Sequence, residues 1–86
     1  MPQICRFFGI IISMFYDEHN PPHFHANYGE YNVEIGICDL AILHGKLPSR
    51  VLGFVIEWAA IHQTELLKNW ERAENGEMVQ PIEPLE

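Results

Sequence analysis

The residues best suited to chemistry lie in one short segment, HNPPHFHA, at residues 19–26. It places His19, His23 and His25 close together, with two prolines between the first histidine and the other two. Side chains two residues apart on a strand point to the same side of a sheet, so His23 and His25 form the kind of pair that strand-borne metal sites use. Imidazole suits zinc, nickel, iron and copper, and the cofactor we expect is a divalent transition metal, zinc or nickel.

Acidic residues complete the candidate ligand set. Asp17 and Glu18 precede the histidines, and the hairpin register described below places Glu34 opposite His25. We therefore take Glu34 as a fourth ligand or as the group that orients the His25 ring. The same groups could act as general acid and base, because imidazole titrates near neutral pH. The structural alternative is that these are ordinary solvated histidines with a stabilising cross-strand His–Glu pair.

Apolar residues in alternation predict that the first half of the chain is an antiparallel sheet. ICRFF and GIIISMFY are rich in β-branched and aromatic residues, and they predict two strands, or one strand kinked at Gly9. HFHANY and YNVEIGI flank Gly29-Glu30 and predict a tight hairpin. LAILH predicts a short further strand. The expected result is a meander of four to five strands within residues 4–44.

One register of the hairpin buries its apolar residues and leaves its polar residues in solvent. A shift by one residue would bury the polar set, so this register should be strongly preferred. It leaves His23 and His25 on the solvated face. The expected pairs are Tyr28 with Tyr31, Ala26 with Val33, Phe24 with Ile35, Asn27 with Asn32, His25 with Glu34, and His23 with Gly36.

From residue 51 to about residue 75 the apolar residues recur every three or four positions, which predicts one long C-terminal helix packed on one sheet face. A continuous helix would be about 40 Å long, so a break near residue 63 is the alternative. Ser49 is the expected N-cap and Gly76 the expected end. His62 is expected in the core rather than at a ligand site. The apolar stripe consists of Leu52, Val55, Ala59, His62, Leu66, Trp70 and Ala73.

The fold class is therefore α+β, with a single domain at residues 1–75 and an extended acidic tail at residues 76–86. The tail sequence EMVQPIEPLE contains three glutamates, two prolines and no basic residue. A chain of 86 residues supports a core of limited size, so a partner, a metal or self-association would help to stabilise it.

A second group of residues on the helix is expected to form an interface. Phe54, Trp58 and Ile61 extend the apolar stripe to roughly two-thirds of the helix circumference, which is wider than an ordinary surface helix needs. Either the tail and the curvature of the sheet cover these residues, or a homodimer or a small partner protein does.

Composition limits the classes of partner. Twelve acidic residues face five basic ones, for a net charge of −7, which argues against direct binding of nucleic acid by the isolated chain.

Cys5 and Cys38 are expected as small apolar residues in strands and not as a disulfide framework. No apolar run reaches the length of a membrane span and no signal peptide is recognised, so we expect a cytoplasmic protein. No serine or cysteine has a recognisable nucleophile setting, and these residues do not decide whether the chain is an enzyme.

Several segments resemble a known family over essentially the whole chain. They are RFFGI (6–10), HNPPHFHA (19–26), GKLP (45–48), EW (57–58) and NWERA (69–73), and they are similar to the bacterial family of domains of unknown function 4160 (DUF4160). The resemblance implies a short bacterial protein, often encoded beside another small protein in an arrangement that looks like a toxin–antitoxin pair. It implies no catalytic residues.

Two functional hypotheses follow. In the first, the chain is an interaction module that forms one half of a two-protein, toxin–antitoxin-like system, which the broad apolar arc and the acidic tail favour. In the second, it is a metal-binding protein, or a small metal-dependent hydrolase or nuclease, that uses His19, His23 and His25.

Overall fold

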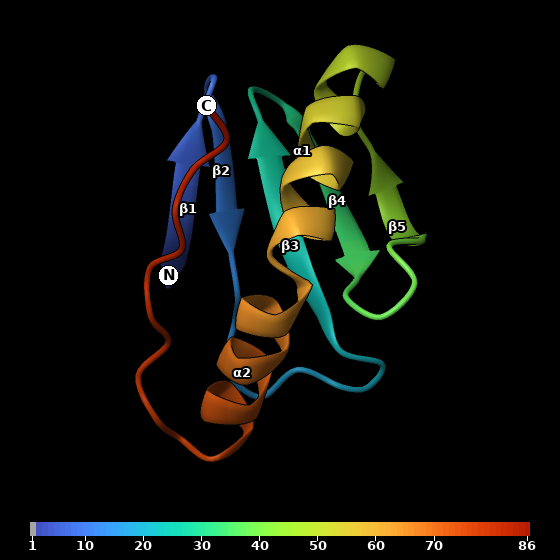
Figure 1. Ribbon diagram of the computed structural model, residues 1–86. Coiled ribbons are helices and arrows are strands. Elements are labelled where there is room, and N and C mark those ends of the chain that lie inside the picture. Colours follow the sequence, from blue (N-terminus) through green and yellow to red (C-terminus); the bar gives the residue numbers. More distant parts are fainter. Residues whose placement is uncertain (1) are drawn as a thin grey trace.

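The computed structural model describes residues 2–86, which contain five strands followed by two helices. The strands form one antiparallel sheet in chain order, β1-β2-β3-β4-β5. Both helices and the C-terminal tail lie over one face of this sheet (Figure 1). The elements are β1 (Gln3–Phe7), β2 (Ile10–Ser13), β3 (His23–Tyr28), β4 (Tyr31–Gly36), β5 (Ile42–Lys46), α1 (Ser49–Ile61) and α2 (Gln63–Glu74).

Turn chemistry sets the strand boundaries. Phe8 and Gly9 both have positive φ, at 51° and 77°, so the first apolar run divides into β1 and β2 rather than forming one kinked strand. Gly29 has a φ of 57° and begins the β3–β4 turn, as the predicted two-residue turn requires. All six predicted residue pairs of this hairpin are confirmed. Leu40 also has positive φ, and the last strand begins at Ile42, two residues later than predicted.

The prediction of one long helix is wrong. The helical region divides into α1 and α2 at His62, whose φ of −113° and ψ of 23° interrupt the helix. A straight helix over residues 49–74 would be about 39 Å long, whereas the Cα atoms of the protein span 34 Å along the longest axis. The break lets α2 turn and cover the end of the sheet (Figure 1). Gln63 holds it in place, since its side-chain amide donates to the main-chain oxygens of Ile37 and Cys38.

The two ends of the helical region differ from the predicted caps in detail. Pro48, and not Ser49, is the N-cap of α1, so Ser49 is already helical. Asn75 is the C-cap of α2, and Gly76 follows with a φ of 72°. Gly76 N–H donates to the Ala73 oxygen, which ends the helix and directs the tail away from it. Neither helix in residues 2–86 is long and apolar enough to cross a membrane.

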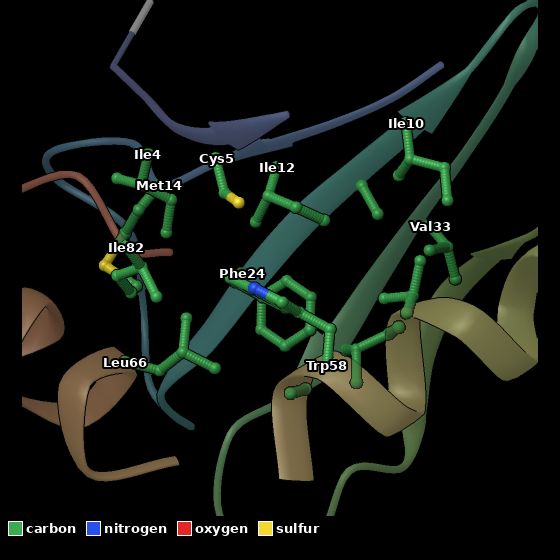
Figure 2. Packing of buried hydrophobic residues seen from close by; sticks show 14 of the residues in the cluster. Ile4, Cys5, Ile10, Ile12, Met14, Phe24, Val33, Trp58, Leu66 and Ile82 are labelled. Atoms are coloured by element: carbon green, nitrogen blue, oxygen red, sulfur yellow. The ribbon is translucent and has the colours of Figure 1, made fainter. Parts of the chain in front are cut away.

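The core lies between the sheet and the helices. Phe24, Val33 and Ile35 of the hairpin face α1 and α2, and each is at most 1% exposed. Figure 2 shows Phe24 against Trp58, with Ile82 of the tail near Ile4. Each large apolar side chain buried in this way contributes about 1.5–3 kcal/mol. Six residues of the expected apolar faces are buried as predicted: Phe24, Val33, Ile35, Val55, Ala59 and Leu66. Tyr28 and Tyr31, beside the hairpin turn, are instead 36% and 43% exposed, because the helices do not cover that end.

Candidate metal centre

The candidate site lies where β3 begins, at the end of the sheet that α2 covers. β2 ends at Ser13, which pairs with His25, so His23 projects beyond the end of β2. The ring of Trp70 from α2 occupies the space beside it, with centroids 5.2 Å apart. His23 is consequently 5% exposed. Our prediction that both histidines lie on a solvated face is wrong for His23, because the helix break brings α2 over it.

The loop before β3 determines which nitrogen of His23 is available. The Nδ1 atom of His23 lies 2.9 Å from the main-chain oxygen of Pro21. Because a carbonyl oxygen only accepts hydrogen bonds, Nδ1 carries the hydrogen, and Nε2 of the neutral ring keeps its lone pair. Pro22 is anchored in turn, since its oxygen accepts a hydrogen bond from Ile37 N. The proline segment therefore orients the His23 ring by its main chain.

His23 Nε2 has an unusual environment. It is buried and has no hydrogen-bond partner within residues 2–86. Its nearest charged neighbours are Glu18 Oε1 and Glu34 Oε1, each at 3.7 Å. A lone pair that faces two carboxylates is repelled by both, so this position calls for a positive charge. A bound metal ion at Nε2 would satisfy it.

Glu18 joins the two histidines. Its Oε1 atom lies 2.7 Å from His25 Nε2, which donates a hydrogen bond to it. Phe15 supports the same ring edge-on, with centroids 4.5 Å apart. The His25 ring lies 5.3 Å from that of His23. His25 is therefore held by a carboxylate on one side and by an aromatic ring on the other.

Together these residues could hold a metal ion. One ligand atom from each of Glu18, His23 and His25 lies within 4.8 Å of the other two. Ligands about 2.0–2.2 Å from zinc lie roughly 3.3–3.6 Å apart in a tetrahedron, so small side-chain rotations would suffice to close the site. A metal ion would replace the hydrogen on His25 Nε2, because a ligand nitrogen must be deprotonated.

One side of this group is open. A pocket of about 280 Å³ is lined by His23, Glu18 and Glu34, together with His19 and Leu43. Glu34 pairs with His25 across the strands, as predicted, but its carboxylate comes within 3.7 Å of His23 Nε2. A fourth ligand or a substrate could therefore reach the group from this pocket.

The predicted ligand set is thus partly brought together. His23 and His25 belong to the group, and Glu34 borders it. His19 is exposed and lines the pocket, but it lies outside the group of three. Glu18 takes the place we expected for His19. The sequence signal for Glu18 was its position just before the proline segment, which did not reveal that the loop folds back onto His25.

The residues predicted as an interface fall into different environments. Trp58 is fully buried, and its Nε1 atom donates to the Glu83 oxygen of the tail. Phe54 is partly buried and contacts Phe8 edge-on, whereas Ile61 is 64% exposed. His62 is partly buried rather than in the core, and its partner is Glu65.

The two cysteines lie apart from the candidate site and form no disulfide with each other. Cys5 is buried and Cys38 is exposed, and both thiols are free. Burial raises the pKa of the Cys5 thiol, which keeps it protonated and unreactive.

Comparison with known proteins yields one family. The model of DUF4160, a domain of unknown function, matches residues 9–71, which include all the residues of the candidate site. No curated protein and no solved structure matches the chain. The match covers most of the 86 residues, and the chain therefore belongs to the DUF4160 family.

Proposed function

We propose that this protein binds a divalent transition metal, zinc or nickel, through Glu18, His23 and His25. The observation that carries the proposal is the buried His23 Nε2 atom, which lacks a hydrogen-bond partner within residues 2–86 and faces two carboxylates. Burying a polar atom without a partner costs about 1–3 kcal/mol. A bound cation removes that cost and balances the two carboxylates.

The donor set supports a metal of this class. Two imidazoles and one carboxylate hold zinc in catalytic sites, where a fourth position stays open for water or substrate. The pocket beside Glu34 supplies such a position. Nickel also binds imidazole well, and magnesium and calcium favour sites made of oxygen ligands alone. We expect zinc and nickel to bind and calcium not to.

The orientation of His23 is also typical of a metal ligand. Ligating histidines donate their second ring nitrogen to a carbonyl or carboxylate, which sets the tautomer and the ring plane. The Pro21 oxygen has this role for His23. His23 is thereby oriented before the metal arrives, which lowers the entropy lost on binding.

Calorimetric titration of the untagged protein tests the proposal. The wild type should bind zinc with a Kd below about 10 μM, or about −7 kcal/mol. His25→Ala should weaken binding at least about a hundred-fold, because it removes one of three ligands and its side chain is 19% exposed, so the fold should persist. His19→Ala, an exposed histidine four positions from His23, is the matched control and should bind as the wild type does.

The outcome that contradicts the proposal is a wild type that binds neither zinc nor nickel more tightly than about 100 μM. Glu18, His23 and His25 would then form a polar cluster that holds the loop against the sheet without a metal. Equal loss of binding in His19→Ala and His25→Ala would place the metal in the solvent-exposed pocket instead.

A second proposal concerns association. We propose that the chain also acts as an interaction module of a toxin–antitoxin-like pair, with a small partner protein or a second copy. An exposed aromatic side chain supports it, since Phe8 is 53% exposed and packs on the partly buried Phe54 with centroids 5.1 Å apart. Ile61 lies two helical turns from Phe54 on the same side of α1. Sedimentation of the wild type and of Phe8→Lys provides the test. A wild type that is monomeric at about 50–100 μM would exclude self-association.

A further inference from the structure

The C-terminal tail contacts the rest of the domain mainly through its main chain, as a bound peptide does. Residues 77–86 form no helix or strand. They run from the end of α2 along β1, on the face of the sheet that the helices cover (Figure 1). We call the residues beneath them, Ile4, Trp58, Asn69 and Arg72, the tail-binding surface.

Asn69 makes the most specific contact of this surface. It is fully buried, its Nδ2 atom donates to the Gln80 oxygen at 2.8 Å, and its Oδ1 atom accepts from Gln80 N at 2.9 Å. The amide thus bonds both main-chain groups of one residue, as a neighbouring strand would. Arg72 Nη1 donates to the same Oδ1 atom at 2.8 Å and so sets the orientation of the amide. A buried, pre-oriented amide of this kind recognises a peptide backbone.

The next contacts also use the main chain of the tail. Ile82 N donates to the Ile4 oxygen at 2.8 Å, and Trp58 Nε1 donates to the Glu83 oxygen at 2.8 Å. Within the described residues, each hydrogen bond from residues 78–86 to the rest of the chain engages the tail through its backbone. Main-chain bonds of this type supply affinity in peptide recognition, while side-chain pockets supply specificity.

One side chain of the tail fills such a pocket. Ile82 is 6% exposed and belongs to the hydrophobic core, next to Ile4 in Figure 2. Pro81 and Pro84 flank Glu83 and Ile82, and their rings fix φ in the extended region. The tail is therefore an extended segment with one fully inserted apolar side chain, with Val79 and Leu85 packed less deeply, and with two prolines that restrict its backbone.

The tail is acidic, with Glu77, Glu83 and Glu86 and no basic residue. Lys68 and Arg72 line a pocket with tail residues 80–82, but Glu65 lines it too, and Glu83 and Glu86 line a second pocket with Glu57. The main-chain hydrogen bonds and the pocket of Ile82, rather than charge, therefore define the ligand.

We infer that the tail-binding surface is a peptide-binding site that the tail occupies in cis. The ligand that fits it is an extended segment of a partner protein, with a branched apolar residue between two prolines. The linker at residues 75–79 connects the tail to α2, and Met78 within it is 78% exposed. The family match covers residues 9–71, so it contains Trp58 and Asn69 of the surface but neither Ile4, Arg72 nor the tail. This site is separate from the candidate metal centre.

Cleavage of the folded, full-length chain tests the inference. A site-specific protease sequence placed after Gly76 allows the tail to be cut once the protein has folded. We expect the cleaved protein to stay folded by circular dichroism after the tail is removed. It should then rebind a fluorescent peptide of residues 77–86 with a Kd of roughly 1–100 μM, measured by anisotropy.

Two peptide variants provide matched controls that leave the protein unchanged. Ile82→Asp should weaken binding about ten-fold or more, because it places a charge in the apolar pocket. Glu83→Gln should bind within about three-fold of the original peptide, because only its main-chain oxygen is hydrogen-bonded. Unfolding of the cleaved protein when the tail leaves would overturn the inference, and so would equal binding of the Ile82→Asp peptide. A dimer in which each chain binds the tail of the other would overturn the assignment to a different partner protein. The partner would then be a second copy of this chain.

Discussion

Replacing Trp58 with phenylalanine distinguishes a side chain covered by the chain's own tail from one at an interface. Trp58 is fully buried, and its ring packs against Phe7 and Phe24 with centroids 5.7 and 5.9 Å apart. Its Nε1 atom donates to the Glu83 oxygen. The substitution removes one hydrogen bond and part of the buried ring system while leaving an aromatic residue in place.

The expected loss follows from these contacts. The hydrogen bond contributes about 1 kcal/mol, and the lost packing and the space left behind add about 1–2 kcal/mol. Trp58→Phe should therefore lower the free energy of unfolding by about 2–3 kcal/mol. The total for 86 residues is about 4–13 kcal/mol, and each kcal/mol shifts the Tm by about 4–8 °C in a domain of this size. Urea denaturation followed by circular dichroism measures the difference.

Ile61→Ala is the matched control on the same helix. Ile61 is 64% exposed, so its truncation should change stability by no more than about 0.5 kcal/mol. A Trp58→Phe variant as stable as the wild type, but with altered sedimentation, would refute the reasoning. Trp58 would then belong to an interface between molecules, and the tail would not be its cover.

Four further outcomes are expected. Gly45→Ala should destabilise the protein by about 2 kcal/mol or more, because φ is +82° and a Cβ would lie 2.2 Å from a main-chain oxygen of β4. Gly53→Ala, with open space around its Cβ, should instead stabilise α1 by about 0.5–1 kcal/mol, and chemical denaturation measures both. A thiol reagent should modify one cysteine per folded chain, the exposed Cys38, and reach Cys5 only in denaturant, because burial raises the pKa of that thiol; two rapidly modified thiols in the native protein would contradict this. Zinc at a hundred-fold excess over its Kd should add about 2.7 kcal/mol to the stability of the wild type and leave His25→Ala unchanged, as judged by thermal melting.

The hairpin was predictable in detail from the sequence. Its alternation of apolar and polar residues admits one register around the Gly29 turn, since a shift by one residue would bury Asn27 and His25. The local pattern therefore placed His25 opposite Glu34 correctly. It also identified His23 and His25 as two of the three residues that could hold a metal ion.

What the sequence did not reveal depends on contacts between distant segments. Glu18 reaches His25 because the loop before β3 folds back, and no spacing rule describes such a loop path. His23 is buried because the helix breaks at His62 and brings Trp70 over it. The apolar arc of α1 was predicted to be wider than a small sheet can cover. Ile82 and its neighbours in the tail cover part of it, and the tail sequence has no periodic pattern that predicts this.

The central claim is the metal centre formed by Glu18, His23 and His25, and anomalous scattering at the zinc edge tests it most directly. Crystals of the untagged protein grown with one equivalent of zinc should show a single strong peak about 2.0–2.2 Å from His23 Nε2, from one His25 nitrogen and from a Glu18 carboxylate oxygen. A peak held by His19 or His44 in place of these ligands, or ordered His23 and His25 side chains with no peak between them, would contradict the account.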